Sequence, residues 1–316
     1  MEVCKLLETR LKQLLDRGDF VVTGEIGAPH GADSSIVINR VEMIRDFCDA
    51  INVPDNARGV PTMSSSVCST FVLQAGAEPI LHLTTRDRNQ IAFQSELYGA
   101  YALGVRNLLI MAGDPTRFGT HPHVKMVNDL DTLEALALAK HLSTGVDSVG
   151  DELEGTPEFY LGATINPNDA SLENQQRRMK AKFEAGAQFF QTQAIFDPVL
   201  LQRFMGQTDN KLNILVGIIP LRDSEMAHFM NDYVPDIQVP DEFIRRLDDS
   251  AKGQEEEQAK IQAMKAEGIQ IALETIEVIR EIDGVNGLHL MGIGWPESIV
   301  ELVKRANLYP RRKVER

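Results

Sequence analysis

Short apolar segments alternate with stretches of helical pattern eight times along this chain of 316 residues. Strands that alternate with helices form parallel βαβ units, and eight such units at this length favour a closed barrel over an open sheet. A doubly wound open sheet is the alternative, but no expected strand is followed by the Gly-x-Gly-x-x-Gly fingerprint that such a sheet would want. The eight expected strands are residues 20–26, 50–54, 79–83, 108–111, 159–165, 189–192, 213–219 and 287–291.

We therefore predict one α/β domain over the whole chain, a single (β/α)8 TIM barrel with an extra N-terminal helix. The helix belongs to residues 1–19, the barrel to residues 20–308 and a short basic tail to residues 309–316. The most polar segment, residues 235–268, is expected to present a solvated helical face, and a further helix is expected over residues 269–282.

The composition argues against several kinds of partner. A formal net charge of −14 makes the chain a poor candidate for binding nucleic acid or an anionic membrane. Three cysteines without a Cys-x-x-Cys pair predict neither a disulfide framework nor a zinc site. His121 and His123 resemble a metal pair only weakly, because no cysteine or carboxylate stands at a helpful spacing, so we predict no metal. The charged N-terminus is not typical of a signal peptide, no apolar run is long enough to span a bilayer, and we expect a cytoplasmic protein.

The clearest strand end in the chain is the segment NLLIMAGDP, residues 107–115. Ala112 and Gly113 end the apolar run, and Pro115 holds the preceding Asp114 in an extended conformation. A carboxylate is thus expected beside a turn of small residues, where a flat molecule could approach the backbone. In (β/α)8 barrels the chemistry lies on the loops that follow the strands. The residues expected to share that mouth are Glu25, Asp55, His82, Thr84, Asp114, Thr164 and Gln193.

These side chains also have purely structural interpretations. Glu25 fits a structural carboxylate as well as a functional one, whereas Asp114 fits a turn former better. His82 lies within an apolar strand, where a satisfied core histidine is the commoner case, and Lys182 on its helix fits a solvated side chain.

The physical chemistry of such a mouth nevertheless favours catalysis. A carboxylate at the end of the first barrel strand is partly desolvated, which is expected to raise the pKa of Glu25 and suit it to general acid work. A second carboxylate, Asp114, would repel it and could lie against a redox ring. Gln193 offers a donor and an acceptor to a planar heterocycle. The pattern is consistent with an oxidoreductase.

Several segments match, in order, the landmarks of one enzyme family. They are GEI around Glu25, DAINVPDN, ILHLTTRDRN, LGVRNLLIMAGDP, KAKFEAGAQFFQTQAIFD, ILVGIIP and, at the final strand, GVNGLHLMGIG. Over about residues 20–308 the chain thereby resembles the catalytic domain of methylenetetrahydrofolate reductase.

The resemblance implies a (β/α)8 barrel that holds FAD at its C-terminal mouth and reduces 5,10-methylenetetrahydrofolate to 5-methyltetrahydrofolate. By position, Glu25 matches the family's general acid, which assists protonation at nitrogen so that the opened iminium ion takes hydride from reduced flavin N5. Asp114 matches a carboxylate near the flavin and the pterin, and Gln193 matches a glutamine that contacts folate. The implied catalytic pair is thus Glu25 and Asp114, joined by Gln193 in substrate binding. The implied cofactor-binding residues are Asp55, His82, Thr84, Ala112, Gly113, Asp114, Thr164, Asn166, Arg178 and Lys182.

Three positions depart from the family pattern. Ala112 stands where many members have arginine, so one FAD contact is missing or is supplied elsewhere, for instance by Arg117. Residues 221–224 lack the aromatic that in many members stacks against nicotinamide or folate, and Gly294-Trp295 replaces an asparagine-arginine pair. The variants resemble a divergent branch from anaerobes, including acetogens, in part of which an iron–sulfur or zinc protein passes electrons to the flavin. We expect such an electron-transfer partner, with NAD(P)H as the alternative donor, and a homo- or hetero-oligomer.

Two other functions stay open at this point. The first is a non-redox folate-binding barrel of a methyltransferase-type system, which bound flavin would exclude. The second is a non-catalytic barrel subunit in which Glu25 is merely structural, which the activity of a Glu25→Gln variant would decide.

Overall fold

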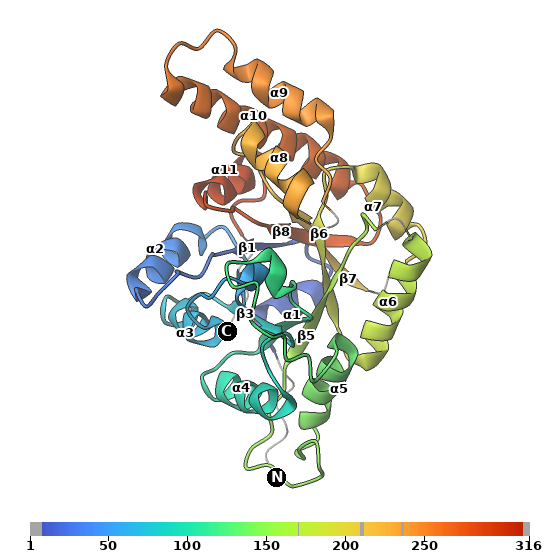
Figure 1. Ribbon diagram of the computed structural model, residues 1–316. Coiled ribbons are helices and arrows are strands. Elements are labelled where there is room, and N and C mark those ends of the chain that lie inside the picture. The colour runs from blue at the N-terminus through green and yellow to red at the C-terminus, as the bar shows by residue number, and fades with distance from the viewer. Residues whose placement is uncertain (1–7, 170, 209–211, 235–236, 312–316) are drawn as a thin grey trace.

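The eight predicted strands are present and form one closed parallel barrel (Figure 1). The computed structural model describes residues 8–169, 171–208, 212–234 and 237–311. The barrel closes because β1 pairs in parallel with both β2 and β8, so that Thr23 lies opposite Ala50 on one side and His289 on the other. In order around the barrel the strands are β1 (Val21–Glu25), β2 (Ala50–Val53), β3 (Pro79–Thr84), β4 (Asn107–Met111), β5 (Tyr160–Ile165), β6 (Phe189–Ala194), β7 (Asn213–Ile218) and β8 (Val285–Leu290).

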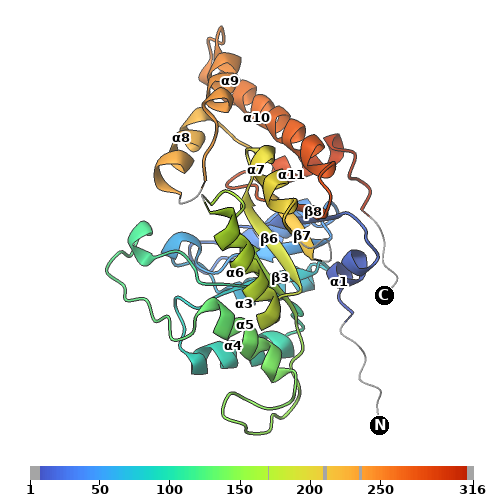
Figure 2. The ribbon, with the colours of Figure 1, turned by 90° about the vertical axis from the view of Figure 1, so that its right-hand side faces the viewer.

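The N-terminal end of the barrel is covered by a short helix, α1 (Arg10–Asp16), whose first turn is capped by the side chain of Thr9. The apolar face of α1 packs against inward-facing residues near the start of the strands, and its buried members are Leu11, Leu14 and Leu15. Figure 2 shows α1 at one end of the barrel and the loop after β4 at the other. The carboxyl ends of the strands therefore face away from α1. Residues 1–7 of the predicted N-terminal helix lie outside the described residues.

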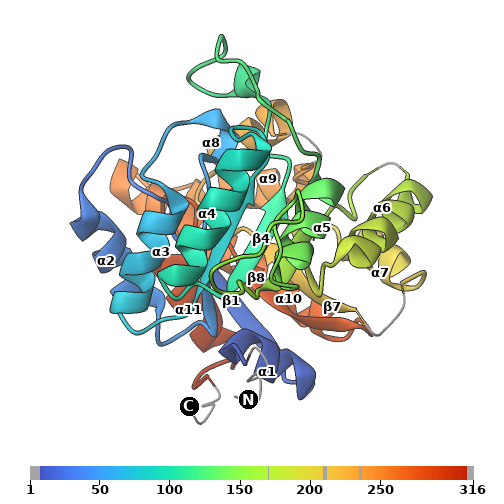
Figure 3. The ribbon, with the colours of Figure 1, turned by 90° about the horizontal axis from the view of Figure 1, so that it is seen from below.

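Helices surround the barrel, and their inner faces meet the outer face of the strands in the main apolar core (Figure 3). Polar residues at the ends of the preceding loops start several of them: Asp33, Asn89, Asp131 and Asp197 each accept a hydrogen bond from a first-turn N–H. The surrounding helices are α2 (Ser34–Ile44), α3 (Ser65–Gln74), α4 (Gln90–Ala102), α5 (Thr132–Leu142), α6 (Leu172–Ala185), α7 (Pro198–Met205) and α11 (Glu297–Arg305). The short 3-10 helices η1 (Ala57–Gly59) and η2 (Thr116–Phe118) lie in the loops after β2 and β4.

An extension projects beyond the barrel, at the top of Figure 1. It contains α8 (Ser224–Tyr233), α9 (Asp241–Ala251) and part of the long α10 (Glu257–Arg280), which share a second apolar cluster. Arg246 of α9 reinforces the pairing through ion pairs at 2.7 Å to Glu267 and 2.6 Å to Glu274 of α10. The sequence predicted a solvated helical face within residues 235–268 and a separate helix from residue 269, whereas α10 is one helix that begins at Glu257. The acidic residues 255–257 are exposed, as a solvated segment should be, although α10 starts only at the last of them.

One boundary that differs from prediction affects the mouth. The sixth strand was expected to end at Thr192, but β6 continues to Ala194 and therefore contains Gln193. Its pairing with β7 is irregular between Gln191 and Ala194, as at a β-bulge, a feature that re-aims side chains near functional sites. Within the described ranges, no helix has the length and apolar character to cross a membrane.

Candidate active site

Glu25 and His289 face each other at the mouth because β1 and β8 are neighbours in the barrel. Glu25 is the last residue of β1, and His289 is the penultimate residue of β8. His289 Nε2 lies 3.6 Å from Glu25 Oε2, slightly longer than a hydrogen bond. The Glu25 side chain is 21% exposed and that of His289 only 4%. The carboxylate therefore reaches the open end of the barrel and rests against a buried imidazole.

The expectation that burial would leave Glu25 with a raised pKa is wrong for this structure. Burial does raise the pKa, but the His289 imidazole, with a smaller contribution from His82, lowers it by more. The net pKa is below the ordinary value of 4.5. Glu25 is consequently ionised near neutral pH, because His289, together with His82, lowers the pKa by more than burial raises it.

A layer of buried polar side chains lies beside Glu25 inside the barrel. His82 Nε2 is 2.9 Å from Asn52 Oδ1, and Asn52 Nδ2 is 3.2 Å from His289 Nδ1. Thr23 Oγ1 also lies 3.2 Å from His289 Nδ1. Burial lowers the pKa of His82 to about 4, so its ring is neutral at physiological pH. Asn52 and His289 were not among the predicted site residues. The sequence feature that could have identified them is a polar residue inside an apolar strand, which is also the feature that marked His82.

Asp55 is held in place by hydrogen bonds and an ion pair to its carboxylate. Its Oδ2 accepts hydrogen bonds from the backbone N–H and the hydroxyl of Thr84, both at 2.9 Å. Arg88 forms an ion pair with the same oxygen at 2.6 Å, and the Asp55 side chain is only 1% exposed. The two predicted cofactor-binding residues Asp55 and Thr84 therefore bind each other, which fixes the loops after β2 and β3.

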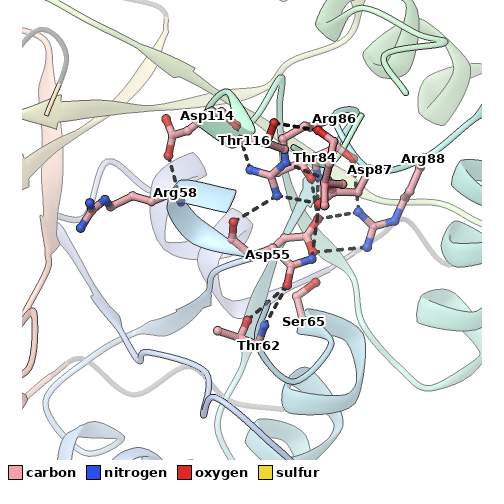
Figure 4. Close-up of polar contacts among 12 residues, drawn as sticks. Asp55, Arg58, Thr62, Ser65, Thr84, Arg86, Asp87, Arg88, Asp114 and Thr116 are labelled. Atoms are coloured by element: carbon pink, nitrogen blue, oxygen red, sulfur yellow. Dashed lines mark hydrogen bonds and ion pairs between the residues drawn. The ribbon is translucent and has the colours of Figure 1, made fainter. Parts of the chain in front are cut away.

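Asp114 is held by the loop that follows β2 (Figure 4). Its Oδ2 accepts a hydrogen bond of 3.0 Å from the backbone N–H of Arg58, which adopts a left-handed conformation with φ 57°. The fully buried Arg86 donates to the backbone oxygens of Asp114 at 3.0 Å and Asn56 at 3.1 Å. One guanidinium thus ties together the loops after β2, β3 and β4. The backbone N–H of Arg58 and the buried guanidinium of Arg86 therefore fix the position of Asp114.

The turn before Asp114 depends on a glycine. Gly113 has φ +83°, which L side chains rarely adopt, and a Cβ there would lie 3.1 Å from the Thr84 side chain. Glycine is therefore required at this strand end by its backbone conformation and by the packing of Thr84, whereas the approach of a flat ligand stays a prediction.

A cationic side is formed by α6, across the mouth from Asp55. Lys182 Nζ donates a hydrogen bond of 2.7 Å to the backbone oxygen of Thr164. Burial, with a smaller contribution from the neighbouring Arg178, lowers the pKa of Lys182 to about 8. Lys182 is thus a partly buried cation next to a second cation, rather than the solvated side chain of the structural interpretation. Such a pair favours a bound anion.

Two adjoining cavities bring most of the predicted residues together. A cavity of about 350 Å³ lies over the strand ends, and one of about 830 Å³ extends from it between the loop after β4 and α6. They share Ala112, Gly113, Thr164, Arg178 and Lys182. The smaller cavity is further lined by the predicted residues Asp55, His82, Thr84, Asp114, Asn166 and Gln193. Glu25 is not part of this lining and connects to it through His289, Asn52 and His82.

The loop after β7 contributes differently from the strand ends. Leu221 is buried against the extension, and Arg222 pairs with Asp223 at 2.7 Å. An aromatic ring instead approaches from α8, where Phe229 stacks under the guanidinium of Arg58 at 4.8 Å. Since the backbone N–H of Arg58 also holds Asp114, Arg58 links the extension to the Asp114 loop.

The remaining titratable candidates do not gather into a second centre. Cys48 and Cys68 are buried free thiols, and burial raises the pKa of both. His121 and His123 are exposed in the loop after β4. Among the residues that the structure describes, no group of three histidine, cysteine or acidic side chains could hold a metal ion.

Fold and site together define a (β/α)8 barrel with two adjoining cavities at the carboxyl ends of its strands. The sequence model of the methylenetetrahydrofolate reductase family matches residues 10–307, and the chain belongs to this family.

Its curated relatives are distant. The chain is 25% identical over 226 residues to a probable methylenetetrahydrofolate reductase (NADPH) of Caenorhabditis elegans, covering 68% of this chain and 32% of that protein. It is 24% identical over 245 residues to methylenetetrahydrofolate reductase 2 of Schizosaccharomyces pombe, covering 73% and 36%. The chain thus spans about a third of the length of these relatives.

A solved structure supports the fold. An uncharacterised protein from Clostridium thermocellum, described as binding two copies of 5-methyl-5,6,7,8-tetrahydrofolic acid, is 14% identical and superposes with a TM-score of 0.65. The match covers 95% of this chain and 99% of that protein. At this identity the likeness concerns the fold.

Proposed function

We propose that this chain binds FAD and catalyses the reduction of 5,10-methylenetetrahydrofolate to 5-methyltetrahydrofolate. The observation that carries the proposal is the mouth itself: a cavity lined by Asp114 and Gln193, with the cations Arg178 and Lys182 on one side and Glu25 nearby, in a chain of the methylenetetrahydrofolate reductase family. The names of the curated relatives and the methyltetrahydrofolate bound by the Clostridium thermocellum protein agree with it.

The residues present fit FAD. Its diphosphate would suit Arg178 and Lys182, because a partly buried lysine beside an arginine gains stability when an anion joins them. The small residues Ala112 and Gly113 line both cavities, so a flat ring could lie against them while the larger cavity holds the rest of the molecule. FAD, when bound, would supply the hydride that the folate receives. Ala112 removes one potential cation, whereas Arg86 is already committed to backbone oxygens and Asp87.

Glu25 is the proposed general acid, and its low pKa constrains how it works. A folate lying across the mouth would exclude water from the 21% of the side chain that is now exposed. Desolvation disfavours the charged carboxylate, so substrate binding would raise the pKa of Glu25. The acid would thus take up its proton as the substrate binds and deliver it to the ring nitrogen that leaves. His289 would keep the carboxylate in place.

Asp114 and Gln193 are proposed to hold the pterin. The Asp114 carboxylate accepts one backbone hydrogen bond and retains lone pairs for the N–H groups of a heterocycle. Gln193 Oε1 accepts the N–H of Ala194 at 3.0 Å, which leaves its amide N–H groups for a ligand. Donor and acceptor would then face the two edges of a planar ring.

The source of electrons is proposed to be a partner protein of the iron–sulfur or zinc type. The motive is the loop after β7, where buried Leu221 and the Arg222–Asp223 pair take the place of a ring that could stack on nicotinamide. A stopped-flow mixing of the FAD-loaded chain with NADH or NADPH tests this. Slow or absent flavin reduction is expected, and rapid stoichiometric reduction would refute the partner.

The decisive experiment is an anaerobic visible spectrum of the FAD-loaded protein before and after addition of 5-methyltetrahydrofolate. Bleaching of the flavin band is expected, because the folate half-reaction runs in reverse without any electron donor. A chain that binds folate without binding flavin would instead be a non-redox folate-binding barrel. Flavin that binds yet stays oxidised would remove Glu25 and Asp114 from the roles proposed for them.

A further inference from the structure

A continuous line of polar contacts joins the cavity to Glu25 through the inside of the barrel. It begins at His82 on β3, which lines the smaller cavity, and passes to Asn52 on β2 at 2.9 Å. Asn52 contacts His289 on β8 at 3.2 Å, and His289 Nε2 lies 3.6 Å from Glu25 on β1. All of these side chains except Glu25 are buried.

The orientation of the Asn52 amide determines which atoms along this line donate hydrogen bonds and which accept them. An amide oxygen only accepts and an amide nitrogen only donates hydrogen bonds. Because Asn52 Oδ1 faces His82, the Nε2 atom of His82 must carry a proton. Because Asn52 Nδ2 faces His289, the Nδ1 atom of His289 must be without one. A neutral His289 then has its proton on Nε2, the atom that faces Glu25.

The opposite orientation of the Asn52 amide would change which ring nitrogen carries the proton in both His82 and His289. With Nδ2 toward His82 and Oδ1 toward His289, His82 Nε2 would have to accept and His289 Nδ1 would have to donate. A neutral His289 would then present a lone pair to the Glu25 carboxylate, which is repulsive. The single hydroxyl proton of Thr23 can go to His289 Nδ1 at 3.2 Å or to the Leu288 backbone oxygen at 3.4 Å, and the shorter contact is the one that agrees with an unprotonated Nδ1.

We propose that Asn52 is a positioning residue that sets the tautomers of His82 and His289 together, so that His289 presents an N–H to Glu25. This inference rests on the proposed function of the same site, because its use is to hold the acid. It also leaves His82 Nδ1 as a hydrogen-bond acceptor on the ring that lines the cavity, so a ligand there is expected to meet an acceptor.

Nitrogen-15 NMR of the imidazole rings tests the proposal without substrate or cofactor. Among the signals of the seven histidines, those of His82 and His289 are assigned with His82→Gln and His289→Gln variants. In the wild type, we expect a proton on Nε2 of both rings and none on Nδ1. In Asn52→Asp, a carboxylate accepts from both neighbours, so His289 Nδ1 is expected to gain a proton while His82 keeps its own on Nε2. Thr23→Val is the matched control, because it removes the other contact to His289 Nδ1 and should leave both tautomers unchanged.

A wild-type His289 protonated on Nδ1 would overturn the proposal even if Asn52→Asp failed to fold, and so would an Asn52→Asp spectrum identical to that of the wild type. In the FAD-loaded protein, Asn52→Asp should slow flavin reoxidation by 5,10-methylenetetrahydrofolate at least about tenfold, with a displaced pH profile, since misplaced acids are inefficient. An unchanged rate and profile despite an altered tautomer would also refute it. Failure of the wild type to react with folate would refute the proposed function instead, while the tautomers would still decide the role of Asn52.

Discussion

Two carboxylates of the barrel, Asp49 and Glu25, have opposite surroundings. Asp49 lies before β2, towards the end of the barrel covered by α1. It accepts the backbone N–H of Val22 at 2.8 Å, an ion pair from Arg10 at 2.7 Å and another from Arg311. Its side chain is fully buried. Glu25 lies at the mouth, partly exposed, with one imidazole 3.6 Å away.

The difference separates a structural carboxylate from one that can act on a ligand. The oxygens of Asp49 are occupied by donors, so a ligand could bind only by breaking a buried ion pair, which is costly. Glu25 keeps lone pairs directed at an open mouth. Location alone does not separate structural from functional carboxylates. Asp55 also lies at the mouth, yet its oxygens already accept a hydrogen bond from Thr84 and form an ion pair with Arg88. The count of internal partners is the better criterion for a functional carboxylate.

The comparison predicts that Glu25→Gln abolishes most of the reaction while leaving the fold intact. We expect flavin reoxidation by 5,10-methylenetetrahydrofolate to slow by about a hundredfold or more, the usual contribution of a general acid. Unfolding in denaturant should change little, since only a 3.6 Å contact with His289 is altered. Stopped-flow absorbance and denaturant unfolding measure the two effects. Undiminished turnover would return Glu25 to a structural role.

The converse prediction concerns Asp49→Asn. Neutralising this carboxylate leaves Arg311 buried without its charged partner and weakens the contact of Arg10, so the free energy of unfolding should fall by about 3 kcal/mol. The reaction of the protein that remains folded should be nearly unchanged. Urea unfolding followed by circular dichroism, with the folate half-reaction measured below the transition, checks this. A large loss of rate at unchanged stability would contradict the distinction.

The sequence predicted the barrel well because strand and helix periods are local signals. Residues 50–54 and 108–111 were predicted as strands from short apolar segments followed by turn residues, and all eight strands appear in order. The mouth was also predictable, because parallel strands bring their carboxyl ends to one side. This placed residues as distant in sequence as Asp55 and Lys182 around one cavity.

The surroundings of each side chain could not be predicted in the same way. Asp49 and Glu25 both adjoin a short apolar strand, and only the folded chain brings Arg311 to one and His289 to the other. The lowered pKa of Glu25 has the same origin, since its cause lies on a strand far away in sequence. Asn52 was passed over because a polar residue inside a strand gives no indication of its partners.

The comparison extends to cations and yields the smallest predicted effect. Arg10 and Arg311 are paired with Asp49, whereas Lys182 contacts a carbonyl oxygen and no carboxylate among the described residues. Burial accordingly lowers the pKa of Lys182 from 10.5 to about 8. If Lys182 holds a phosphate of FAD, the positive charge of Lys182 favours FAD binding below about pH 8 and is lost above it. FAD affinity should therefore fall about tenfold as the pH rises through 8, the usual contribution of one charge-assisted hydrogen bond.

The stability of the flavin-free protein should change in the opposite direction. Between about pH 8 and 10.5 the unfolded chain still holds the proton that folded Lys182 has lost, so the contribution of this group to stability rises with pH over that window. Lys182→Arg is the matched control, because arginine stays charged and should keep FAD affinity independent of pH in this range. Lys182→Met should bind FAD weakly at every pH. Titrations of FAD fluorescence at pH 7 and 9 compare the three proteins, and an equal pH dependence in wild type and Lys182→Arg would show that the titrating group is elsewhere.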